Sequence, residues 1–114
     1  MRELGGLLPD TLMWLKRLVD LNSFTSNAIG VNRVAEVTAE MFAELGFSAE
    51  LAASDHASYG KHLFLKRVGS DDAKPVVLVT HSDTVFPPDE EARNDFHWLE
   101  SPWENRIYGP GTVD

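Results

Sequence analysis

The first regular pattern along the chain is a stripe of apolar residues at helical spacing. Its members are Leu8, Leu12, Leu15 and Val19. Proline and an acidic residue both suit the first turn of a helix, and Pro9 and Asp10 stand near the beginning of this stripe. The pattern predicts an amphipathic core helix over residues 9–21.

A second helical stripe follows a polar turn. It follows the i, i+3, i+4, i+7 pattern of an amphipathic helix, and its members are Val31, Val34, Ala35, Thr38, Met41, Phe42 and Leu45. Ser26 or Asn27 can cap the amino terminus of such a helix, and Gly46 is well placed to end it. The spacing predicts a helix over residues 29–45.

Beyond Gly46 the apolar pattern becomes that of β-strands. Residues 47–52 alternate between apolar and polar side chains, which predicts a half-exposed outer strand, and residues 62–68 predict a second strand. Residues 76–80 form an unbroken run of apolar and β-branched side chains, typical of a strand covered on both faces. We therefore expect one α/β domain over residues 1–114, with helices packed on a mixed sheet of at least three strands and residues 76–80 innermost.

The last third of the chain has a weaker pattern. Residues 86–104 are rich in acids, prolines and aromatic residues without a clear period, so we expect a long loop with one short helical turn near residues 90–93. Ile107 and Tyr108 predict a short strand, and residues 109–111 a tight turn.

Composition and charge exclude several classes of protein. The chain contains no cysteine, which excludes disulfides, thiolate metal ligands and a cysteine nucleophile. Its net charge is −8, with ten acids and eight bases in residues 1–82 but eight acids and two bases in residues 83–114. Such a charge makes nucleic acid a poor candidate partner. Charged residues interrupt the apolar amino terminus before a signal peptide or membrane span could form, so we expect a cytoplasmic protein with no membrane partner.

The residues that carry candidate chemistry directly follow the apolar run of residues 76–80. Side chains two apart on a strand point the same way, so His81 and Asp83 leave an extended chain on one side. A carboxylate placed in this way can accept a hydrogen bond from one imidazole nitrogen and aim the other nitrogen at a metal ion. Open α/β sheets bind ligands at the carboxyl ends of their strands, which favours a metal site here. The alternative is a capping aspartate beside a surface histidine.

Several segments together resemble the amino-terminal part of a zinc metallopeptidase family. The family includes glutamate carboxypeptidase, acetylornithine deacetylase and succinyl-diaminopimelate desuccinylase. The resemblance is carried by VVLVTHSDTVFP at residues 76–87 and IYGPGTVD at residues 107–114, with MFAELGF at 41–47 and LVDLNSFTSNAIG at 18–30 in the same order and spacing. It covers nearly the whole chain, and the carboxypeptidase-like branch looks nearest.

The resemblance implies a set of site residues and an activity. His81 would bind one metal, Asp83 would orient its imidazole and be catalytic, and Asp114 would bridge two zinc ions, for which cobalt can substitute. Family members are hydrolases that cleave an amide bond next to a free carboxylate, in small peptides or N-acyl amino acids. The resemblance also implies a homodimer for the full-length parent.

The resemblance further implies groups that these 114 residues do not contain. In the family a general-base glutamate, further metal ligands and a dimerisation domain come after the bridging aspartate, at which this sequence stops. We therefore expect part of the catalytic domain of a dizinc exopeptidase fold, inactive by itself. The alternative from another functional class is a non-catalytic module that binds a partner, or self-associates, through an uncovered sheet edge.

Overall fold

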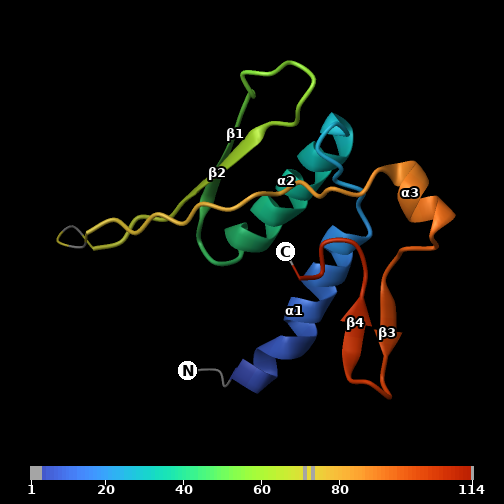
Figure 1. Ribbon diagram of the computed structural model, residues 1–114. Helices are drawn as coiled ribbons and strands as arrows, with labels where there is room; N and C mark the ends of the chain where they lie inside the picture. Colours follow the sequence, from blue (N-terminus) through green and yellow to red (C-terminus); the bar gives the residue numbers. More distant parts are fainter. Residues whose placement is uncertain (1–3, 71, 73, 114) are drawn as a thin grey trace.

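The protein is described by a computed structural model of residues 4–70, 72 and 74–113 (Figure 1). Helices and short strands follow one another along the chain, which makes the fold a mixed α/β one. In chain order the elements are α1 (Leu4–Val19), α2 (Ala28–Ala43), β1 (Ser48–Ala52), β2 (His62–Lys66), α3 (Pro88–Arg93), β3 (Leu99–Ser101) and β4 (Arg106–Tyr108). Among the described residues no helix is long and apolar enough to cross a membrane.

The two long helices pack together and hold the small core of the molecule. The core residues are Trp14, Val19, Val31, Val34 and Ala35. Of the predicted stripes, Val19, Val31, Val34 and Ala35 are buried, whereas Leu8 and Leu45 at the outer ends of the stripes are exposed. The predicted start of the first helix is wrong, because Pro9 lies inside α1 rather than in its first turn. At that position proline has no N–H to donate to the carbonyl four residues earlier, so α1 lacks one main-chain hydrogen bond there.

Both ends of α2 are formed by the local interactions that the sequence predicts. Asn27 is the N-cap residue, and its side chain accepts a hydrogen bond of 3.2 Å from the Gly30 amide. At the other end Gly46 adopts φ 82°, which is favourable only for residues without a β-carbon. The amides of Gly46 and Phe47 bond back to the carbonyls of Ala43 and Phe42, the pattern of a Schellman motif.

The strands form two separate hairpins instead of the single mixed sheet that we expected. β1 pairs with β2 in antiparallel fashion, with Glu50 opposite Phe64, and β3 pairs with β4, with Leu99 opposite Tyr108. The predicted strand over residues 62–68 is shorter, ending at Lys66. The β1–β2 hairpin packs against α2.

The segment predicted as the innermost strand is the largest correction. Residues 76–80 are extended but belong to no strand, and Val76, Val77, Leu78 and Val79 are 78–92% exposed. Figure 1 shows residues 74–87 as a long trace, yellow to orange, that reaches α3 without joining either hairpin. A buried strand needs hydrogen-bonding neighbours on its edges and cover on both faces. Within the described part of the chain β1 and β2 pair with each other, and neither supplies an edge to residues 76–80.

The acidic last third contains more structure than the loop we expected over residues 86–104. The predicted helical turn is confirmed as α3, and the predicted strand at Ile107 and Tyr108 as β4. The strand β3 was not predicted. The β3–β4 hairpin lies against the end of α1, where a β-carbon at Gly109 would come within 2.8 Å of Val19. The whole molecule is a flat layer with extents of 52 × 42 × 18 Å. Its radius of gyration is 16.1 Å, against about 13 Å for a compact chain of this size.

Candidate functional site

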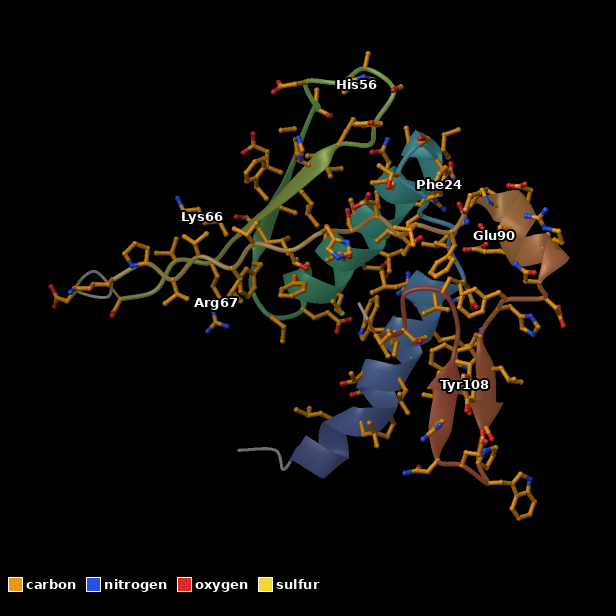
Figure 2. The ribbon with its side chains drawn as sticks, in the orientation of Figure 1. Phe24, His56, Lys66, Arg67, Glu90 and Tyr108 are labelled. Atoms are coloured by element: carbon orange, nitrogen blue, oxygen red, sulfur yellow. The ribbon has the colours of Figure 1, made fainter. Side chains whose placement is uncertain are left out.

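The candidate site lies where the chain after residues 76–80 meets the loop between α1 and α2. The Thr84 amide donates to the Ser23 carbonyl at 2.8 Å, and the Thr25 amide donates to the Thr84 carbonyl at 3.2 Å. These bonds form a short parallel bridge between Phe24 and Thr84. Figure 2 labels Phe24 in this loop, beside the segment that leads to α3. Two segments about 60 residues apart in sequence are thereby fixed side by side.

The loop between the helices is itself held by a network of amide side chains. Asn27 donates to the Asn22 carbonyl at 3.0 Å, and Asn22 in turn donates to the Phe86 carbonyl at 2.9 Å. Gly30 is needed for this arrangement, because a β-carbon there would lie 1.8 Å from the Asn22 carbonyl oxygen. The first turn of α2 therefore approaches the loop closely. The loop is held in one conformation, in which it forms hydrogen bonds with residues 83–86.

Asp83 is the best-anchored acidic group in this region. The hydroxyl of Thr25 donates a hydrogen bond of 2.5 Å to Oδ2 of Asp83. The Asp83 side chain is 34% exposed, so part of it remains open to a ligand or water. Thr25 was not singled out by sequence reasoning. The feature of the sequence that could have pointed to Thr25 is its position in the polar turn between the two helical stripes.

His81 is oriented by the main chain of Asp83. Its Nδ1 lies 2.8 Å from the Asp83 carbonyl oxygen and 3.7 Å from Oδ1 of the Asp83 carboxylate. A carbonyl oxygen can only accept, so Nδ1 carries the proton, and Nε2 of the neutral ring keeps its lone pair. The sequence predicted a hydrogen bond from this ring to the Asp83 carboxylate, but the bond is made to the Asp83 carbonyl instead. The His81 side chain is 61% exposed and open to solvent.

The donor atoms at this site suit zinc in kind but not in number. Zinc takes imidazole nitrogen and carboxylate oxygen, usually with three or four protein ligands. Across residues 4–70, 72 and 74–113, no three His, Asp or Glu side chains converge in a way that could hold a metal ion. Asp114, the third predicted site residue, lies outside the described residues.

The remaining histidines, His56, His62 and His97, are exposed. His56 stacks on Tyr59 with ring centroids 4.4 Å apart, and its Nδ1 lies 2.8 Å from the Ser58 hydroxyl. Nδ1 of His97 lies 3.2 Å from the Asp95 carboxylate. Figure 2 shows His56 at the far end of the β1–β2 hairpin, away from the loop that carries Phe24.

Comparisons of this chain with models of protein families, with curated proteins and with solved structures found no match.

Proposed function

We propose that this chain supplies part of the metal site of a zinc-dependent hydrolase that cleaves amide bonds next to a free carboxylate. The substrates would be small peptides or N-acyl amino acids. The observation that carries the proposal is the hydrogen bond from Nδ1 of His81 to the Asp83 carbonyl, which leaves Nε2 free to bind a metal. The sequence resemblance over residues 76–87 and 107–114 supports the same assignment.

Each residue of the proposed site has a separate task. His81 binds one metal ion through Nε2, and the Asp83 carbonyl fixes the tautomer of its ring. The Thr25 hydroxyl holds the Asp83 carboxylate beside the ring. Asp114 is the proposed bridging ligand. Zinc, or cobalt in its place, would polarise the amide carbonyl and lower the pKa of a bound water.

We further propose that residues 1–114 alone have no significant turnover. His81 and Asp114 are the only proposed ligands among these residues, whereas a catalytic zinc site uses three protein ligands. The resemblance assigns no general base within these residues, and a general base contributes roughly 10²–10⁴-fold to such reactions. The assay is hydrolysis of N-acyl amino acids and of a carboxy-terminal glutamate substrate in the presence of zinc or cobalt. Metal-dependent turnover that His81→Ala abolishes would contradict this part of the proposal.

Cobalt binding tests the metal site without requiring turnover. We expect Co²⁺ to give a ligand-field absorption spectrum with the purified chain, and His81→Ala to weaken the affinity at least about tenfold. Asp83→Ala should weaken it less, because the carbonyl that orients His81 remains. His97→Ala is the matched control, since His97 is also an exposed histidine beside an aspartate. Equal losses in His81→Ala and His97→Ala would contradict the proposed site.

A second candidate function is the binding of a partner through residues 76–80. The specific observation in its favour is the exposure of Val76, Val77, Leu78 and Val79. An extended apolar segment with unpaired main-chain groups is a template for a further strand. Size-exclusion chromatography with light scattering distinguishes self-association from a monomer that needs another protein as its partner.

A further inference from the structure

A cavity of about 450 Å³ lies between the segment that follows the candidate site and the β3–β4 hairpin. It is lined by Phe86 and Phe96, by all of β4, and by the turn that follows β4. Figure 2 labels Tyr108, a lining residue on β4. The volume falls within the range of about 300–1,000 Å³ typical of sites for small molecules.

The two phenylalanines that line the cavity are held in place by contact with each other and by hydrogen bonds of their main chains. The rings of Phe86 and Phe96 meet edge to face, with centroids 5.0 Å apart and an interplanar angle of 80°. The carbonyl of Phe86 accepts a hydrogen bond from Asn22, and the amide of Phe96 donates to the Glu91 carbonyl at 2.9 Å. The apolar surface is therefore held in place before any ligand arrives.

The opposite part of the lining is also held by hydrogen bonds. The Tyr108 hydroxyl donates to the Glu104 carboxylate at 2.9 Å. The amide and the hydroxyl of Thr112 both donate to the Gly109 carbonyl, at 3.3 and 3.0 Å. Because both parts are held by hydrogen bonds, a ligand would meet a preformed site and lose little free energy in ordering it.

Among the described residues that line the cavity, Arg106 is the only charged one. Within the described part of the chain no carboxylate lies within 4.0 Å of its guanidinium, although residues 83–114 contain eight acids and two bases. An arginine that pairs with no described carboxylate, beside an apolar cavity, complements a ligand that has an apolar body and one carboxylate.

We propose that this cavity binds small monocarboxylates with an aromatic or branched apolar body. The body contacts Phe86 and Phe96, and the carboxylate pairs with Arg106. The inference is independent of the proposed hydrolase function, because it requires neither a metal ion nor turnover.

The test is an amide ¹H–¹⁵N NMR titration of the metal-free chain with 3-phenylpropionate. We expect saturable shifts at β4 and the following turn, with Arg106→Gln weakening the affinity about fivefold, as for a partly exposed ion pair. The uncharged 3-phenylpropionamide cannot pair with Arg106. Its affinity for the wild-type chain should therefore be about as low as the affinity of 3-phenylpropionate for the Arg106→Gln variant. Acetate, which has no apolar body, should give no saturable shifts there.

Arg93→Gln is the matched control variant. Arg93 is the other base of residues 83–114, lies on α3 and does not line the cavity. Its substitution changes the net charge as Arg106→Gln does and should leave the affinity unchanged. Three results would each overturn the proposal: no saturable shifts with 3-phenylpropionate up to its solubility limit, equal affinity for the acid and the amide, or equal losses in the two arginine variants.

Discussion

The hydroxyl of Thr25 and the carboxylate of Asp83 are joined by a hydrogen bond of 2.5 Å. Thr25 belongs to the loop between α1 and α2, whereas Asp83 follows the extended segment of residues 76–80. The bond therefore places the acidic group of the candidate site against the helical part of the molecule. It also holds that group beside His81, whose ring the main chain of Asp83 supports.

Replacing the Thr25 hydroxyl by a methyl group should loosen this connection. We expect Thr25→Val to lower the free energy of unfolding by about 1 kcal/mol, because a hydrogen bond to a charged but partly exposed carboxylate is lost. Urea denaturation measures the change. Thr11→Val is the control, since the Thr11 hydroxyl bonds only to the Leu7 carbonyl within its own helix. Equal losses in the two variants would contradict a special role for Thr25.

Two glycines should respond to alanine in opposite directions. A β-carbon would have no neighbour within 4 Å at either Gly6 or Gly46, so packing does not decide the result. Gly46 has φ 82°, and Gly46→Ala should cost about 1–2 kcal/mol of stability. Gly6 lies within α1, and Gly6→Ala should stabilise the chain by up to about 1 kcal/mol. Thermal unfolding of both variants checks the signs, and a stabilised Gly46→Ala would refute the proposed helix end.

The ion pair between α1 and α2 should make stability depend on pH in the acid range. The hydrogen bond from Arg17, together with its positive charge, holds the pKa of Glu40 below its ordinary value of 4.5. A lowered pKa in the folded state stabilises the fold above pH 4.5, and this contribution disappears as the pH falls through the lowered pKa. Glu40→Gln should therefore be less stable than the wild type near neutral pH but not in strong acid.

The partner variant of this ion pair provides the control. In an Arg17→Gln background, Glu40→Gln should have no pH-dependent effect on the free energy of unfolding, because the hydrogen bond is already absent. Urea denaturation at a series of pH values gives both comparisons. A pH-dependent effect of the same size in both backgrounds would show that another group lowers the Glu40 pKa.

The exposure of residues 76–80 leads to a prediction about association. Val77→Ser and Val79→Ser should change the free energy of unfolding by less than about 0.5 kcal/mol, because both side chains are mostly exposed. Together they should reduce self-association and the binding of a hydrophobic dye, measured by light scattering and fluorescence. Ile29→Ser is the control, since Ile29 is 79% exposed but lies on α2. A severe loss of stability in the valine variants would show that residues 76–80 are buried in the folded protein.

The sequence predicted best those features that depend on residues close together in the chain. The end of α2 is one example, because the Phe47 amide bonds to the Phe42 carbonyl and the two rings meet at 5.2 Å. The cap at Asn27 is another, formed with an amide three residues away. At the candidate site, the contact of His81 with Asp83 was predictable for the same reason, although the choice of carbonyl over carboxylate was not.

The features that sequence reasoning missed depend on residues far apart. Nothing in the local pattern pairs Thr25 with Asp83 or Asn22 with Phe86, since such contacts arise only when two loops meet. The same holds for the cavity beside Arg106, whose lining comes from residues 86 to 113.

The apolar run of residues 76–80 shows most clearly which properties follow from the local sequence and which depend on the tertiary structure. The sequence by itself determined that this segment is extended, because β-branched side chains favour that conformation. Whether it is buried was decided by the tertiary structure alone. Burial depends on which strands lie beside a segment and what covers its faces. Here β1 and β2 pair with each other, and Leu78 and Val79 remain 90% and 92% exposed.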